Sequence, residues 1–361
     1  MNLSHMNKKK MEVIIYFYIL LILGFLVVIF SENILPDKYF IDSNTIREYF
    51  DIANDFSLKF FEGFWNTAWL YKLMLINKLD SRVLEGIVNY SIYYICLIFT
   101  ILLLKKNIPL KYALLLLVWN IPAAIYLGQL TKEIFIVPIL VLQIVAFQKK
   151  SRFLIFLSIL LIIFYAMFFR NYWLIIICMT IMIFLVRIYF IKYNFIVKTF
   201  MVISGMLAIF VVANFGGMYL TDSRFNVNEI LESETMINNL LINTSVFSDL
   251  VNWFIAWVSI LFPLPLLVKG GLTQKCFLIL AIYTFYVFIK CIRRYNKNSK
   301  ETKDYSVEWS IAFVISFSMV QGIFEPDYGS VLKHQVVMIP MYFYVILYCH
   351  TLLDKRSNKD S

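Results

Sequence analysis

The chain has 361 residues, of which 61% are hydrophobic and only 16% are charged, and its mean hydropathy is +0.76. A soluble domain of this size would carry about a quarter charged residues. The composition therefore excludes an ordinary soluble fold and predicts a protein solvated by lipid. The net charge of +10 does not indicate nucleic acid as a partner, because the basic residues lie in short clusters at the ends of apolar runs, as orientation signals do.

The apolar runs predict an all-α, polytopic integral membrane protein that forms one membrane domain over residues 1–361. Three lysines, Lys8 to Lys10, precede the first run, which is too long for a signal-peptide core and is expected to be a retained signal anchor. Ten runs have spanning length: 11–30, 87–104, 112–128, 134–148, 153–169, 172–189, 198–215, 275–292, 308–324 and 335–353.

Two long polar segments, 31–86 and 216–274, interrupt these runs, and the second contains an ambiguous apolar stretch at 252–268. If this stretch does not cross the membrane, 21 of the 33 basic residues and 6 of the 23 acidic residues fall on the cytoplasmic side. If it crosses, this bias disappears. The charge distribution therefore favours an interfacial or re-entrant segment, with both termini in the cytoplasm. Pro263 and Pro265 within the stretch agree with this, because each removes a helix hydrogen bond.

The long polar segments are expected to fold outside the membrane. Apolar residues recur every three or four positions in 43–61, which predicts an amphipathic helix on the membrane surface or over the mouth of the bundle. A weaker pattern of this kind covers 227–250. A small lid that packs on itself is the alternative for both.

No signature of a soluble enzyme is present: the sequence has no GxGxxG, Walker loop, GxSxG or HExxH motif. The three histidines are far apart in sequence, and the five cysteines lie in apolar segments without a CxxC pair. No metal site, disulfide framework or cofactor is therefore expected.

Charged and aromatic residues gather in the short turns that this topology places outside, whereas the apolar runs are almost free of charge. A transporter coupled to protons or ions usually has ionisable groups near the bilayer midplane, so the pattern favours an enzyme that acts on a lipid-linked polar group. The groups at the outer boundary are Lys132, Glu133, Arg170, Tyr172, Trp173, Glu325, Asp327, Tyr328, Lys333 and His334, with Asp42, Arg47, Arg224 and Glu229 in the long segments.

Each of these residues also has a structural interpretation. Lys132 and Arg170 are of the type that anchors helix ends at an interface, and Glu133 is a natural ion-pair partner for Lys132. Residues 325–330 contain the residue types of a tight turn. His334 begins an apolar run, where a hydrogen-bonded interfacial histidine is common.

The chain resembles the Wzy-type polymerases of O-antigen and capsular polysaccharide repeat units. The resemblance lies in Pro36 to Ser43 after the first run, in Thr131-Lys132-Glu133, in Phe324 to Ser330 and in Lys333-His334, with the proline-bearing element at Pro263 to Pro265. Where that family has an arginine in the last outer turn, this chain has Lys333. The span pattern covers almost the whole chain.

The resemblance implies a bacterial inner-membrane glycosyltransferase that acts at the periplasmic face without a cofactor. It would transfer a growing glycan from undecaprenyl pyrophosphate to the next lipid-linked repeat, with the bilayer and a chain-length regulator as further partners and without nucleic acid. The implied catalytic residues are Arg170, Glu325, Asp327 and His334. The implied substrate-binding residues are Lys132, Glu133, Arg224, Lys333, Tyr172, Trp173 and Tyr328.

In this interpretation the cations Lys132, Arg170 and Arg224 stabilise the departing diphosphate. Glu325 or Asp327 is the base for the acceptor hydroxyl, with His334 as the second candidate, and the aromatic residues stack on sugar faces. Three other functions remain open: a flippase for lipid-linked sugars, a ligase that transfers the finished glycan to a lipid, and a structural membrane subunit.

Overall fold

The computed structural model describes residues 3–52, 57–104, 108–190, 195–224, 235–298 and 303–357. Over these residues the fold is helical, with a single isolated β-bridge between Met236 and Asp327 and no strand. The chain divides into two compact units. Unit 1 comprises 1–173 and 333–361, and unit 2 comprises 174–332, so that the boundary falls inside the helix Tyr328–Gln335.

The helices of unit 1 are α1 (Leu3–Ile34), α2 (Ile41–Ile52), α3 (Gly63–Leu73), α4 (Arg82–Leu102), α5 (Leu110–Leu127), α6 (Ile136–Gln148), α7 (Arg152–Phe168) and α16 (Ile339–Ser357). Those of unit 2 are α8 (Trp173–Tyr189), α9 (Phe195–Phe215), α11 (Val246–Leu261), α12 (Leu266–Lys269), α13 (Leu272–Asn298) and α14 (Tyr305–Phe324). The boundary helix is α15 (Tyr328–Gln335), and short 3₁₀ turns lie at Asp37–Tyr39, Ile76–Lys78, Glu133–Phe135 and Val336–Met338.

Every one of the ten predicted apolar runs is largely helical in the structure. Within the described ranges, seven helical segments are long and apolar enough to cross a membrane: α1, α4, α5, α9, α13, α14 and the continuous stretch Tyr328–His350. The helices α6, α7, α8 and α11 are shorter apolar helices. The all-α, multi-pass membrane architecture is thereby confirmed at this level, by length and composition.

Close packing in unit 1 depends on two glycines at the crossing of α1, α4 and α5. A Cβ atom on Gly86 of α4 would lie 2.4 Å from the carbonyl oxygen of Gly128, and one on Gly128 would lie 2.4 Å from a methyl of Val28. Only hydrogen fits at these positions, as in small-residue contacts between membrane helices. Nearby, Tyr90 donates to Asn120 Oδ1 at 2.9 Å, and Asn120 Nδ2 donates to the Leu20 carbonyl at 2.9 Å.

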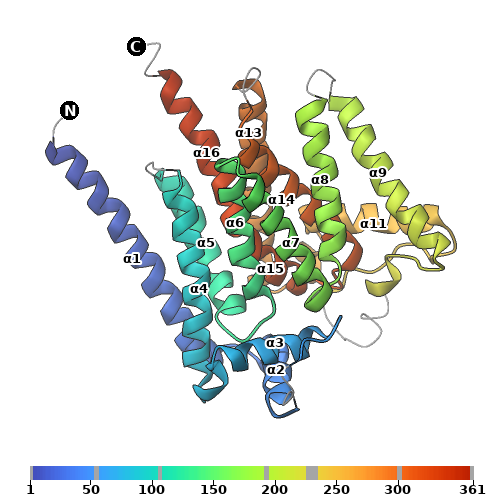
Figure 1. The fold of residues 1–361 in the computed structure, drawn as a ribbon, viewed down its shortest axis with the longest axis horizontal. Coiled ribbons are helices and arrows are strands. Elements are labelled where there is room, and N and C mark those ends of the chain that lie inside the picture. The colour runs from blue at the N-terminus through green and yellow to red at the C-terminus, as the bar shows by residue number, and fades with distance from the viewer. Residues whose placement is uncertain are drawn as a thin grey trace. The chain divides into compact units, whose positions relative to one another are not determined.

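Helices α2 and α3 lie at one end of unit 1, and the start of α1 and the end of α16 lie at the other (Figure 1). The amphipathic helix expected over 43–61 is present only as α2, which ends at Ile52. Residues 53–56 lie outside the described part of the chain, and 57–60 are not helical. Phe61 has a φ of 63°, which ends any helix there, so this part of the prediction was wrong.

In unit 2, α11 runs across α8 and α9 instead of alongside them (Figure 1). It packs on α14, where Gly322 allows the close approach: a Cβ there would lie 2.8 Å from Trp257 Cβ. The Ser245 and Ser248 side chains cap the start of the helix. The chain turns at Phe262–Pro265 before the short α12, so the apolar stretch expected at 252–268 is not one continuous helix.

The second amphipathic pattern, 227–250, does not form a helix over its described part before Val246. Residues 225–234, which include Ile230, Leu231 and Glu229, lie outside the described residues. Residues 237–245 are extended or bent and lead into α11. Of the apolar residues in this segment, Ile237 is buried, whereas Leu240, Leu241 and Ile242 are exposed, so they do not form one helical face.

The ninth apolar run contains a buried ion cluster, which the charge pattern of the sequence did not predict. Glu308 in α14 is fully buried. Its carboxylate contacts Arg187 Nε at 2.5 Å and Lys303 Nζ at 3.1 Å. The cluster joins α8 to the start of α14, where Asp304 caps the helix by accepting from the Ser306 and Val307 backbone N–H groups.

Candidate functional site

The candidate site of unit 1 is built around the turn that joins α5 to α6. Two tyrosines hold this turn: Tyr71 of α3 bonds the Thr131 backbone at both its N–H and its carbonyl, at 3.1 and 3.0 Å. Tyr165 of α7 donates to the Lys132 carbonyl at 3.2 Å. Thr131, Lys132 and Glu133 are all at most 4% exposed. A buried polar turn of this kind is costly unless its groups are paired.

Glu133 joins three groups from separate parts of unit 1. One carboxylate oxygen accepts from Arg170 at 2.6 Å and lies 3.1 Å from His334 Nε2. The other accepts from the Thr131 hydroxyl. Glu133 is therefore the hub of a charge-assisted network between the turn, the end of α7 and the end of α15.

Asp42 at the start of α2 closes the network on its other side. It is paired with Lys333, and its carboxylate lies 3.8 Å from Arg170. Burial alone would raise the pKa of Asp42, but Lys333, Lys132 and Arg170 outweigh burial and the neighbouring Glu133, so its pKa is lowered. Asp42 was recognised in the sequence only as an outer charged residue, and its pairing with Lys333 gives it a place in the site.

Arg170 keeps hydrogen-bonding capacity beyond its pairing with Glu133. Burial acts against its charge, but Glu133 more than compensates and raises the pKa of Arg170, so the guanidinium stays charged. Its Nε is buried without a hydrogen-bond partner among the described residues. The side chain is 23% exposed, and Asp42 and Lys333 nearby are 24% and 20% exposed. These three side chains are the most exposed charged groups of the network.

Lys132 has a different environment from the other cations. Its Nζ lies 3.3 Å from the centroid of the Phe64 ring of α3. Burial, assisted by Arg170, lowers the pKa of Lys132 to about 7. A cation–π contact of about 1 kcal/mol would favour the ammonium form, but this is equivalent to less than one pKa unit and offsets only a small part of the lowering.

The two aromatic residues after Arg170 take different positions. Tyr172 is partly exposed, and its ring lies 6.1 Å from that of His334. Trp173 is only 2% exposed and packs edge-on against Tyr165, with ring centroids 5.6 Å apart. Tyr172 is thus available to a ligand at the edge of the site, whereas Trp173 supports the site from behind.

The network has more positive than negative groups. Three permanent or titratable cations and one histidine surround two carboxylates, and most of them are less than one quarter exposed. Such an arrangement can bind an anion with several oxygens, because arginine and lysine donors remain on its open side. Among the described residues, no group of three His, Cys, Asp or Glu side chains has the arrangement of a metal site.

A comparison with known proteins gives no match. No family model, no curated protein and no solved structure is significantly similar to this chain. The resemblance noted from the sequence therefore stays a hypothesis, and the site is interpreted from its own geometry.

The other four predicted site residues, Glu325, Asp327, Tyr328 and Arg224, belong to unit 2. Asp327 caps α15: its carboxylate accepts from the backbone N–H of Gly329 at 2.7 Å and of Ser330 at 3.0 Å. Tyr328 is bonded to Ser259 of α11. Glu325 follows the last residue of α14 and is 4% exposed. The positions of these residues agree with the turn interpretation of 325–330, and their predicted roles in chemistry remain predictions.

Arg224 is fully buried in unit 2. It donates to the Gly322 carbonyl at 2.9 Å and also to Asn239 Oδ1. Burial lowers its pKa to about 10, so it stays charged at neutral pH. These bonds hold the segment before 225 against the end of α14, and the predicted contact with substrate remains untested.

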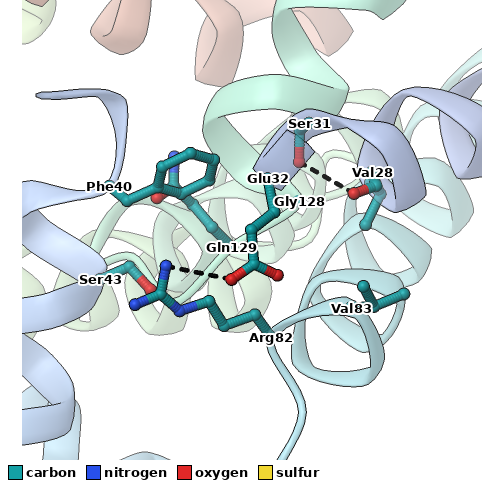
Figure 2. A pocket seen from close by; sticks show the side chains of 9 residues that line it. All are labelled: Val28, Ser31, Glu32, Phe40, Ser43, Arg82, Val83, Gly128 and Gln129. Atoms are coloured by element: carbon teal, nitrogen blue, oxygen red, sulfur yellow. Dashed lines mark hydrogen bonds and ion pairs between the residues drawn. The ribbon is translucent and has the colours of Figure 1, made fainter. Parts of the chain in front are cut away.

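None of the network residues lines the small pocket of unit 1 that Figure 2 shows. Its lining comes from α1, the start of α2, the start of α4 and Gly128-Gln129, and its volume of about 10 Å³ has room for about one water molecule. Beside it, Arg82 forms an ion pair with Glu32 at 3.3 Å (Figure 2). Arg82 also donates to Asn44 Oδ1 at 3.0 Å. The pocket is too small for a sugar, and Arg82 joins three helix ends.

Proposed function

We propose that this chain polymerises lipid-linked oligosaccharide repeat units, transferring a glycan from a polyprenyl diphosphate carrier to the next repeat at the outer face of the membrane. The resemblance of its sequence motifs to the Wzy-type polymerases supports a bacterial inner-membrane location. Undecaprenyl pyrophosphate is the carrier that this resemblance implies. The single observation that carries the proposal is the network of Asp42, Lys132, Glu133, Arg170, Lys333 and His334 in unit 1.

The composition of the network suits a reaction with a diphosphate leaving group. A diphosphate departs without a general acid when its developing charge is stabilised by fixed cations. The Arg170 and Lys333 side chains are both partly exposed and carry the cationic donors for such a group. Because Glu133 and Asp42 hold these two side chains in place, little reorganisation is needed when the negative charge develops.

The placement of the network also suits a lipid-linked substrate. The site lies where several apolar helices of unit 1 end, beside α2 and α3. Exposed apolar side chains occur on and around these two helices: Ile41, Ile52, Phe60, Phe61, Leu73, Met74 and Leu75. In this proposal the polyprenyl tail lies among lipid-facing helices while the glycan lies over the polar end of the unit.

The topology that belongs to this proposal has ten crossings, with α11 interfacial or re-entrant. The transverse direction of α11 in unit 2 supports it (Figure 1), as does the position of the α1 start and the α16 end at one end of unit 1. Both termini are then cytoplasmic, and the turns with Lys132 and Arg170 lie on the outer side. The excess of basic residues on the side of the termini is the reason for assigning that side to the cytoplasm.

The experiment that tests this function is a deletion strain whose surface polysaccharide is separated on a gel. We expect single repeats to remain on the lipid acceptor while long chains are absent. Loss of all surface glycan, single repeats included, would instead indicate a ligase. Accumulation of lipid-linked repeats on the cytoplasmic face would indicate a flippase. An unchanged ladder of long chains would contradict the polymerase, ligase and flippase functions alike.

A further inference from the structure

Lys132 differs from the other cations of the site because no carboxylate is paired with it. Arg170 and Lys333 form ion pairs with Glu133 and Asp42, whereas Lys132 forms none with any residue that the structure describes. Lys132 is also only 4% exposed. Burial without a directly bonded counter-charge shifts an amine toward its neutral form and away from its ammonium form.

The charged groups that act on Lys132 lie on α2, on α15, after α7 and at the adjacent Glu133, whereas α3 contributes the Phe64 ring. Asp42 on α2 and the adjacent Glu133 favour its ammonium form, whereas Arg170 after α7 and Lys333 on α15 oppose it. His334 is bonded to Glu133 and shares that carboxylate with Arg170. Burial is the largest effect, and the pKa of Lys132 falls to about 7. A large fraction of the amine is then neutral at physiological pH.

The carboxylates of the network are poorly suited to accept a proton. Glu133 already accepts from Arg170 and Thr131 and contacts His334, and Asp42 is paired with Lys333. Ion pairing of this kind holds a carboxylate in its ionised form and lowers its basicity. A neutral amine is a stronger base than a paired carboxylate. In this network, Lys132 is the residue that can supply a neutral amine.

We propose that Lys132 is the proton acceptor of the site and takes the proton from the acceptor sugar hydroxyl during glycan transfer. This inference rests on the proposed function. The hydroxyl oxygen bonds to the anomeric carbon while the bond from that carbon to the diphosphate breaks, and the electron pair leaves with the diphosphate. The hydroxyl proton passes to Lys132 Nζ, directly or through one water molecule, and the ammonium later releases it to solvent.

The first measurement needs no substrate. Unfolded Lys132 stays protonated up to its ordinary pKa, whereas the folded protein releases that proton above about pH 7, so raising the pH from 7 to 9 favours the folded state through this group. We expect the unfolding midpoint of the purified wild-type protein in detergent to rise between pH 7 and pH 9. The midpoint of Lys132→Met should lack this rise. Lys59 is a matched control, since its Nζ lies 3.2 Å from the Trp65 ring centroid but the residue is exposed; Lys59→Met should keep the rise. A pH dependence that is equal in all three proteins would overturn the inference.

The second measurement follows chain elongation in membranes of the producing strain with their own lipid-linked repeats. Lys132→Arg keeps a cation but cannot act as a base near neutral pH. We expect at least about a 100-fold loss of elongation rate at every pH, the usual contribution of a general base. Lys59→Arg should stay within twofold of the wild type. If Lys132→Arg does not fold, Lys132→Met takes its place with the same expected loss.

The outcomes separate the inference from the proposed function. Wild-type membranes that make no polymer, under conditions in which the producing cells do, would contradict the proposed function itself. If the wild type elongates chains and Lys132→Arg does so at a similar rate, Lys132 acts only as a cation, and this inference alone fails. Loss of elongation in Lys132→Arg, together with a pH-dependent rise in wild-type activity through about pH 7, supports it.

Discussion

At the scale of single residues, the geometry of the candidate site depends on how tightly Glu133 is held. Its two carboxylate oxygens contact Arg170, His334 and Thr131, and it is only 2% exposed. A buried charge of this kind is tolerated only while its partners remain. Glu133 therefore has a structural task, the positioning of Arg170 and His334, and its loss should affect both stability and elongation.

Replacement of Glu133 by glutamine tests this positioning. Glu133→Gln keeps the shape but leaves the Arg170 guanidinium without its closest counter-charge. We expect the free energy of unfolding to fall by about 2 kcal/mol, somewhat below the cost of breaking a fully buried pair because Arg170 is partly exposed. Thermal unfolding in detergent measures the change, with Glu62→Gln at an exposed position as the control. Equal stability of both variants would show that Glu133 does not hold Arg170.

At the scale of elements, α3 fixes the end of α7 from which Arg170 projects. Asn66 in α3 is fully buried. Its Nδ2 donates to the carbonyls of Phe168 and Lys59, at 2.6 Å each, and its Oδ1 accepts from the Lys59 backbone N–H at 2.8 Å. One side chain thus joins α3, the irregular segment before it and the last residue of α7. The orientation of Arg170 depends on this junction.

Substitution of Asn66 by alanine should loosen the junction. It removes one part-buried hydrogen bond to the Phe168 carbonyl and two to the Lys59 backbone, at a cost of about 2 kcal/mol, and it frees the end of α7. We expect Asn66→Ala to unfold at a lower temperature and to elongate chains more slowly, although Asn66 itself touches no substrate. Asn33→Ala, at an exposed position, is the matched control and should behave like the wild type. A variant with lower stability but full elongation would separate α3 from the function of the site.

At the scale of the whole molecule, the proposed topology assigns each turn to one side of the membrane. The α1–α2 connection and the 325–330 turn are expected outside, and the α6–α7 connection inside. Single cysteines at positions 38, 327 and 152, in a chain whose five cysteines have been replaced, test this assignment. We expect an impermeant thiol reagent to label 38 and 327 in intact inner-membrane spheroplasts and 152 only after permeabilisation. Labelling of 327 only from the cytosol would contradict the topology.

The sequence predicted the helical architecture well because it is encoded locally. Each long apolar run specifies a helix wherever lipid is the solvent. It did not predict α3, whose buried face includes Asn66 and Thr67 and so lacks a clear apolar period. It also assigned Phe60 and Phe61 to a helix that ends earlier, since residues 57–60 are not helical and Phe61 has a positive φ.

The candidate site was predicted in its residue types but not in its pairing. The turns with Lys132, Glu133 and Arg170 were recognised because charged residues gather there beside apolar runs that are almost free of charge. Lys333 and His334 were recognised because the 325–334 region carries more charge than a turn needs. The pair of Asp42 with Lys333 joins residues 291 positions apart, and no local pattern carries that information. The burial of Arg224 against Gly322 was likewise not foreseen, since an arginine in a polar segment is normally exposed.

The most direct test of the account is the surface polysaccharide of a deletion strain that carries Arg170→Ala. Arg152→Ala, at an exposed arginine at the start of α7, is the control. Arg170 is the arginine of the network, with a partly exposed side chain that Glu133 holds in place. We therefore predict single repeats without long chains for Arg170→Ala and a normal ladder for Arg152→Ala. A normal ladder of long chains in Arg170→Ala, with the protein present in the membrane, would contradict the central claim.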